Sequence, residues 1–127
     1  MRLLFEAAIR SDDPRVLYKA RQHELGLAVG PRTYVEGLIE MIMSRPEELD
    51  ATIKELAPAW PIAQMAQLEV AILRIGIAEI DSGQVPPAVV INEAVELAKQ
   101  YCTDGGRRLV NGALGTYAKR QPNSASD

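Results

Sequence analysis

Two glycines followed by two arginines form the part of this sequence best suited to hold a ligand. Gly105 and Gly106 precede Arg107 and Arg108, and the backbone N–H groups at a helix start can donate to a phosphate. Cations in the first turn oppose the helix dipole at a cost of roughly a few tenths of a kcal/mol, so their placement points to a role other than helix stability. The pattern indicates either an RNA phosphate site or a plain turn. A P-loop is excluded, because no Gly-Lys-Ser/Thr follows.

Catalytic and metal-binding candidates are few. Asn92 and Glu93 could orient a substrate and act as a base, but they are better interpreted as the cap and a first-turn acid of a helix. Cys102 lies on an apolar face with no nearby histidine, so an inert core cysteine is expected. A single cysteine excludes an internal disulfide and a cysteine-based zinc site, and a single histidine, His23, argues against a triad. The sequence therefore predicts a protein that is not an enzyme and binds no cofactor or metal.

Composition places the chain among helical proteins. Its 127 residues suffice for one domain with a single core, and 47% of them are apolar while only 5% are aromatic. A core of aliphatic residues and methionine favours helices over a β-sandwich. No apolar run approaches the ~18 residues of a membrane span, and the first residues lack the pattern of a signal peptide. A reduced, cytoplasmic protein is expected.

Charge is unevenly spread along the chain, although the net charge is only −3. Between residues 36 and 96 there are eleven acids and three bases, whereas residues 105–126 carry four bases and no acid. This asymmetry indicates either a basic contact surface on an acidic body or an ordinary solvated helix with a basic tail.

Hydrophobic periodicity and breaking residues predict seven helices. They are expected at residues 1–11, 14–28 and 33–44, between Ser44 and Pro58, at 61–81, from a start between Pro87 and Asn92, and after Gly106. Ser44 is expected to cap the fourth helix, with Glu47 in the reciprocal position of a capping box. The fifth helix is apolar almost all round, which is typical of the buried centre of a bundle. Residues 1–121 are expected to form a single domain and residues 122–127 a flexible tail.

The sequence also suggests environments for three polar or aromatic side chains in and just before the fifth helix. Glu69 lies within an apolar arc, so it is either partly buried near the rim or forms a salt bridge with a partner protein. Arg74 is expected to pair with Glu93 or Glu79 across helices. Trp60 is interpreted as packing over the entry to the fifth helix, with base stacking as the alternative.

The second half of the chain resembles the NusB family of bacterial transcription antitermination factors. The resemblance rests on Trp60, Ile72-Leu73-Arg74, Glu79, Pro86, Ile91-Asn92-Glu93-Ala94, Leu97-Ala98-Lys99 and Val110-Asn111-Gly112-Ala113-Leu114. It implies an all-α fold of about seven helices in two helical subdomains. It also implies an RNA-binding factor that acts with NusE, a small-subunit ribosomal protein, on single-stranded boxA RNA of ribosomal RNA operons in the transcription elongation complex.

The same resemblance suggests roles for individual residues. It implies RNA binding by Arg2, Gly105, Gly106, Arg107 and Arg108 and partner binding by Phe5 and Glu69. Glu69 is accordingly expected at the surface beside the first helix, where it would face NusE.

The sequence also departs from the family pattern. Members usually begin with an arginine-rich segment, whereas here only Arg2 and Arg10 lie near the first helix, so either the start is assigned too late or RNA binding is weaker. Leu109 stands where an aromatic can stack on a base, and Gly106 replaces a residue that often bears a hydroxyl. The alternatives are a protein-binding scaffold with weak or lost RNA binding, or an accessory domain like that of ribosomal RNA cytosine methyltransferases. Monomer and homodimer both remain open.

Overall fold

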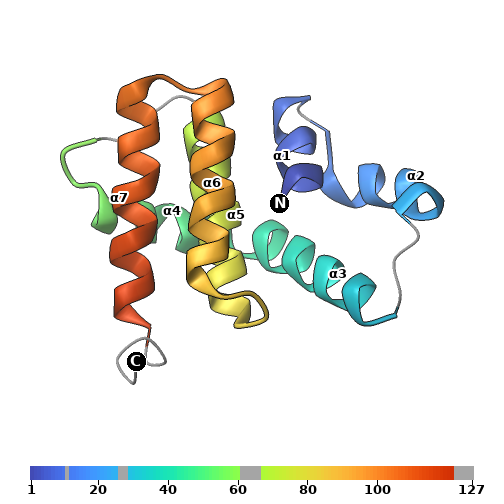
Figure 1. Cartoon of the computed structure of the whole chain (residues 1–127). Helices are drawn as coiled ribbons and strands as arrows, with labels where there is room; N and C mark the ends of the chain where they lie inside the picture. The colour runs from blue at the N-terminus through green and yellow to red at the C-terminus, as the bar shows by residue number, and fades with distance from the viewer. Residues whose placement is uncertain (11, 26–28, 61–66, 122–127) are drawn as a thin grey trace.

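The computed structural model describes residues 1–10, 12–25, 29–60 and 67–121, and within them every regular element is an α-helix (Figure 1). The seven helices are α1 (Arg2–Ile9), α2 (Pro14–Leu25), α3 (Val29–Ser44), α4 (Pro46–Leu56), α5 (Gln67–Ser82), α6 (Pro87–Tyr101) and α7 (Asp104–Arg120). The all-α prediction is therefore confirmed. Residues 61–66, where the fifth helix was expected to begin, and the tail 122–127 lie outside the described residues.

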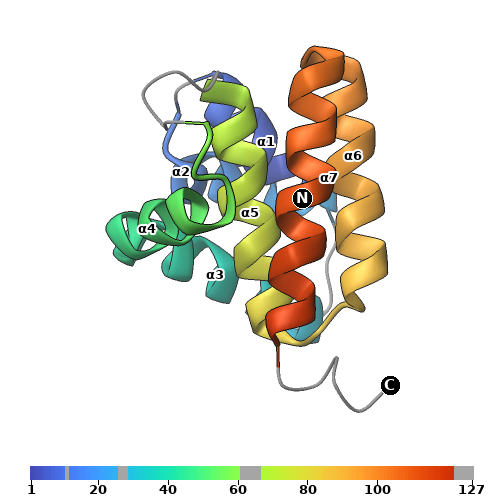
Figure 2. The same cartoon turned by 90° about the vertical axis from the view of Figure 1, so that its left-hand side faces the viewer.

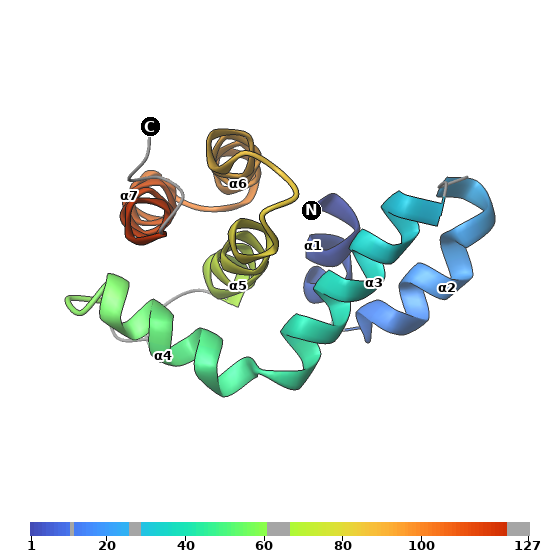
Figure 3. The same ribbon diagram turned by 90° about the horizontal axis from the view of Figure 1, so that it is seen from below.

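Helix α5 is the centre of the fold, as its almost uniformly apolar surface predicts. It contacts α1 and α3 on one side and α4, α6 and α7 on the other. Seen from below, α1, α2 and α3 form one group and α4, α6 and α7 the other, with α5 between the two groups (Figure 3). Helices α5, α6 and α7 stand side by side, and α4 crosses beside them (Figure 2). The largest fully buried side chains come from six positions on α4, α5 and α7 and one on α6: Ile53, Ile72, Leu73, Ile77, Val90, Val110 and Leu114.

A glycine allows α5 and α7 to approach closely. A Cβ at Gly76 would lie 2.8 Å from Cδ1 of Leu114, which is fully buried. Carbon atoms do not pack that closely, so a larger residue at position 76 would push the Leu114 side chain away. The backbone of α5 is therefore positioned directly against the α7 segment that follows the two arginines.

Two predicted helix caps are wrong. Ser44 belongs to α3, where its hydroxyl donates to the Glu40 carbonyl at 2.6 Å, and α4 begins at Pro46 without a side-chain cap. Asn92 is exposed within α6, which begins at Pro87. In both cases a proline starts the helix, because its fixed φ suits the first helical position and it has no N–H to be satisfied. Both helices therefore begin at a proline and form no side-chain cap hydrogen bond.

Candidate nucleic-acid interface

The α6–α7 connection places the two arginines at the start of a capped helix. The Thr103 hydroxyl accepts a hydrogen bond from the Gly106 N–H at 3.1 Å, so Thr103 is the N-cap of α7. Arg107 is half-buried, and its Nη2 lies 3.9 Å from Oδ1 of Asp104. Arg108 is exposed. Two adjacent guanidinium groups thus lie near the N-terminus of α7, where backbone amides also attract anions.

The two glycines are not a turn before the helix, as the sequence suggested, but the second and third residues of α7. Helix N-termini leave N–H groups without intrahelical partners, and here Thr103 already occupies that of Gly106. Only the N–H groups of Asp104 and Gly105 remain for a phosphate at this end. The contribution of Gly106 to phosphate binding stays a prediction, and its amide would have to leave the Thr103 hydroxyl to make that contact.

Glu69 is not at the surface, contrary to prediction. Only 8% of the residue is exposed, and its carboxylate lies against the α-carbon of Gly106: a Cβ on Gly106 would be 2.2 Å from Oε1 of Glu69. Its charge also reaches Cys102, since burial, chiefly, and the Glu69 carboxylate raise the pKa of that thiol. The fold therefore brings the residue predicted to bind a partner directly onto the helix turn predicted to bind RNA.

Phe5 joins α1 to the end of α6. The residue is 2% exposed, and its ring centroid lies 5.2 Å from that of Tyr101 at a tilt of 54°. Such tilted aromatic pairs contribute about 0.5–1.5 kcal/mol beyond their buried area. Tyr101 itself is 49% exposed at the last position of α6, two residues before the cap of α7. Sequence reasoning missed this aromatic, although its position just ahead of the Gly-Gly-Arg-Arg segment was a usable signal.

Leu109 belongs to the core. It is 9% exposed and packs in the main apolar cluster. The Leu109 side chain is therefore directed inward, and the exposed aromatic side chain of the α6–α7 junction is that of Tyr101.

Arg2 lies apart from the α7 arginines. It is exposed and lines a hollow of about 550 Å³ with Asn92, Glu93 and Glu96 from the middle of α6. Its surroundings are acidic, so the fold does not combine the three arginines into one patch.

The basic residues of α7 occupy its two ends. Arg107 and Arg108 are at the start, while Lys119 and Arg120 are in the last turn. At 1.5 Å per residue the two pairs lie roughly 18 Å apart. Arg120 also pairs with Glu55 on α4 at 3.3 Å. The acid-free stretch of sequence therefore supplies two separate basic positions instead of one continuous surface.

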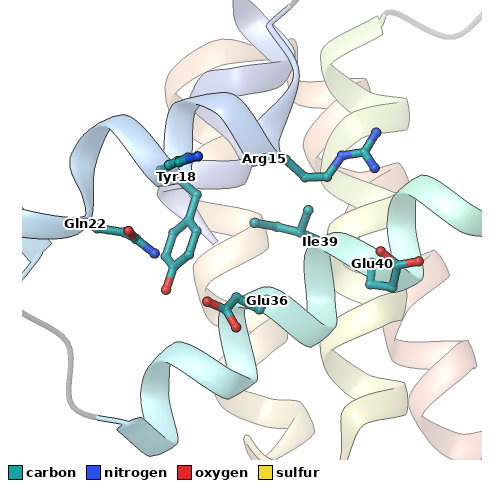
Figure 4. Close-up of a pocket in the computed structure, with 7 residues that line it drawn as sticks. Arg15, Tyr18, Gln22, Glu36, Ile39 and Glu40 are labelled. Carbon is teal, nitrogen blue, oxygen red and sulfur yellow. The ribbon is translucent and has the colours of Figure 1, made fainter.

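A pocket of about 330 Å³ opens between α2 and α3 (Figure 4). Residues of both signs line it: Arg15, Tyr18, Lys19, Gln22, Glu36, Ile39 and Glu40. Opposed charges on two walls do not favour a polyanion such as RNA. Tyr18 is 4% exposed, and its hydroxyl has no hydrogen-bond partner in the described part of the chain.

Trp60 is 48% exposed just before the residues outside the description. Its predicted packing over the entry to α5 involves residues 61–66, so that prediction remains open. Across the described ranges, no cluster of three or more His, Cys, Asp or Glu side chains could hold a metal ion. In the same ranges no helix has the length and apolarity to cross a membrane.

Comparison with known proteins gives consistent matches over nearly the whole chain. The NusB family matches residues 1–119. The chain is 37% identical to the transcription antitermination protein NusB of Roseiflexus sp. (strain RS-1), over 94% of this chain and 87% of the relative. It is also 37% identical to that of Saccharopolyspora erythraea, over 91% of this chain and 79% of the relative.

Two solved structures share the fold. T. maritima NusB matches with a TM-score of 0.77 at 24% identity, over 97% of this chain and 88% of that one. A protein chain in the crystal structure of a plectonemic RNA supercoil matches with a TM-score of 0.71 at 26% identity, over 92% of this chain and 86% of that one. The first of these likenesses establishes the arrangement of helices.

Proposed function

Because this chain belongs to the NusB family of transcription antitermination proteins, we propose that it binds single-stranded boxA-like RNA together with NusE, the small-subunit ribosomal protein. In this proposal the complex acts on ribosomal RNA operons within the transcription elongation complex. The observation that carries the RNA part is the adjacent pair Arg107 and Arg108 near the N-terminus of α7.

The start of α7 offers complementary contacts for a single strand. Arg107 and Arg108 supply charge for the phosphates, and the N–H groups of Asp104 and Gly105 supply donors. Tyr101 offers an exposed ring on which one base can stack, and such stacking contributes about 1–3 kcal/mol. The α6–α7 junction thus offers positive charge, backbone donors and an aromatic face, which together can bind single-stranded RNA.

The partner surface adjoins this junction. Phe5 is buried, so in this proposal it acts by supporting the exposed ring of Tyr101 and the first helix behind it. Glu69 lies against Gly106 at the same junction. A partner that covers the starts of α5 and α7 would lie beside RNA bound at the start of α7. The chain and its partner would then each contribute part of one RNA-binding surface.

A second candidate is a protein-binding scaffold that binds RNA weakly. The acidic surroundings of Arg2 favour it, because Glu93 and Glu96 reduce the attraction that Arg2 would exert on a phosphate. In that case the chain would retain the partner surface and lose most of the RNA affinity.

Titration of a fluorescent boxA-like RNA with the chain, with NusE and with both distinguishes the candidates. The proposed function requires weak binding by the chain alone and an affinity at least about tenfold higher with NusE, as expected when two partial surfaces are joined. A scrambled RNA of equal length is the control. NusE binding without any gain in RNA affinity would support the scaffold, and failure to bind either molecule would refute both.

A further inference from the structure

The hydroxyl of Tyr18 is a buried polar group in the wall of an open pocket. Tyr18 is 4% exposed and lines the pocket of about 330 Å³ between α2 and α3, and its hydroxyl has no hydrogen-bond partner in the described part of the chain. Most buried polar atoms in proteins are paired, and an unpaired one costs more than a hydrogen bond contributes. The hydroxyl is therefore placed to bond a group that enters the pocket.

The groups around this hydroxyl are hydrogen-bond acceptors. In Figure 4 the Tyr18 ring extends from α2 toward α3, and its hydroxyl lies between the side chains of Gln22 and Glu36. The Glu36 carboxylate only accepts, and the Gln22 amide oxygen and the phenolic oxygen accept as well. Ile39, which is 3% exposed, adds an apolar surface to the same lining. A ligand group that fits this end of the pocket must therefore bring several donors.

The charges of the lining favour a cation. Arg15 is already held by Asp13, which accepts its backbone N–H at 2.9 Å and lies 3.4 Å from both its Nε and its Nη2. The lining then has one further cation, Lys19, and two carboxylates, those of Glu36 and Glu40. All three side chains are exposed, so salt weakens their field without reversing its sign. A positively charged ligand is therefore attracted to this pocket.

We propose that the pocket between α2 and α3 binds a guanidinium group, the head group of arginine. Guanidinium is a planar cation with five N–H donors, whereas a lysine ammonium has three. Two of its donors would reach the Glu36 carboxylate and a third the Tyr18 oxygen, while the alkyl stem lies against Ile39. A volume of about 330 Å³ is at the small end of the roughly 300–1,000 Å³ of ligand sites, which suits one side chain. The site is separate from the RNA and NusE surfaces.

Blocked amino acids test the head group without the charges of the α-amino and α-carboxyl groups. N-acetyl-arginine methylamide should bind the full chain saturably in NMR titrations, with shifts in the amide signals of α2 and α3. The citrulline analogue has the same shape without the charge and should bind at least about tenfold more weakly, because charged hydrogen bonds are lost. The lysine analogue keeps the charge but has fewer donors, and it should bind about threefold more weakly.

Free arginine, titrated in the same way, distinguishes the two sources of this head group. An affinity at least about tenfold higher than that of the blocked probe would identify a free amino acid as the ligand, since the α-groups then add contacts. Equal affinities would identify an arginine side chain of a protein.

Substitutions in the lining should change the affinity in opposite directions. Tyr18→Phe and Glu36→Gln should each weaken binding of the blocked arginine by about three- to tenfold, because each removes or weakens an acceptor. Lys19→Met should strengthen it by up to about threefold, because a repelling charge at an exposed position is lost. Glu47→Gln and Lys54→Met are the matched controls, since both residues are exposed on α4 and outside the pocket. Neither control should change the affinity.

The outcomes judge the pocket alone. Saturable binding that prefers arginine to citrulline, and that weakens in Tyr18→Phe and Glu36→Gln, would support the site. No binding, equal binding of the citrulline analogue, or an unchanged affinity in either folded variant would overturn it and leave a pocket that holds only water. Weaker binding in Lys19→Met would overturn it too.

Helical circular dichroism confirms that each variant is folded. Glu36 is exposed, so Glu36→Gln still tests the site if Tyr18→Phe does not fold. RNA and NusE are absent from these titrations, so a negative result leaves the proposed function intact.

Discussion

The guanidinium group of Arg74 on α5 holds the carboxylate of Asp50 on α4 through two parallel hydrogen bonds, Nε to Oδ1 and Nη2 to Oδ2, both of 2.7 Å. Each side chain is about one-third exposed. Two-pronged pairs of this kind fix both distance and orientation. The pair therefore ties α4, which has no side-chain N-cap, to the central helix.

Loss of this pair should destabilise the fold measurably. Charged hydrogen bonds contribute about 1.5–3 kcal/mol, and partial exposure reduces that value, so Arg74→Met should lower the free energy of unfolding by about 1–2 kcal/mol in urea denaturation. Arg120→Met is the control, because its single 3.3 Å contact with Glu55 is between exposed side chains. A surface pair of that kind contributes about 0–1 kcal/mol. Equal losses in the two variants would contradict the prediction.

The Arg74 partner illustrates what sequence can and cannot predict here. Periodicity placed all seven helices and identified α5 as central, because the pattern of apolar residues is set by each helix alone. The prediction that Arg74 pairs with Glu93 or Glu79 was wrong, since the polar strip of a helix does not reveal which neighbour faces it. Glu69 was misplaced for the same reason: a gap beside Gly106 arises only when α5 and α7 are packed together.

Acidity should affect stability through Glu79. Burial raises the pKa of this carboxyl above its ordinary 4.5, while the nearby Met1 nitrogen, at 3.6 Å, opposes the shift. Between 4.5 and the raised pKa the folded chain binds more protons than the unfolded chain, so this residue makes stability fall as pH rises through that window. Urea denaturation at pH 4, 5.5 and 7 should show the wild-type chain losing stability relative to Glu79→Gln across the window. Glu96 is exposed, so the wild-type chain should lose no stability relative to Glu96→Gln across the same window. An equal loss relative to both variants would exclude burial as the cause.

The hydroxyl of Tyr18 should be dispensable for folding. It is buried without a hydrogen-bond partner in the described chain, and an unsatisfied buried polar group costs about 1–3 kcal/mol. Tyr18→Phe should therefore leave the free energy of unfolding unchanged or raise it by up to about 2 kcal/mol. Tyr34→Phe is the matched control: its hydroxyl lies 3.4 Å from Oε1 of Glu79 and donates to it, so its loss should destabilise by about 0.5–1.5 kcal/mol. A clear loss of stability in Tyr18→Phe would mean that its hydroxyl is satisfied in solution.

Replacing both Arg107 and Arg108 with alanine should weaken RNA binding through lost phosphate contacts. The expected signature is a smaller dependence of affinity on salt, with the log–log slope reduced by about 0.7 for each lost contact to a single strand, or about 1.4 for both. The loss should be similar for boxA-like and scrambled RNA, because phosphates carry no sequence information.

Two further variants locate the effect on α7 and its junction. Lys119→Ala with Arg120→Ala removes the same charge at the other end of the helix, and it should change the salt slope much less. Tyr101→Ala should lower the affinity by about 1–3 kcal/mol with an unaltered slope, because a stacking contact releases no counterions. Titrations of labelled RNA in the presence of NusE at several salt concentrations measure the affinity and the salt slope of all three variants. If the Lys119 and Arg120 variant instead flattens the slope while the Arg107 and Arg108 variant does not, the strand follows the far end of α7 and the interface proposed at its N-terminus is wrong.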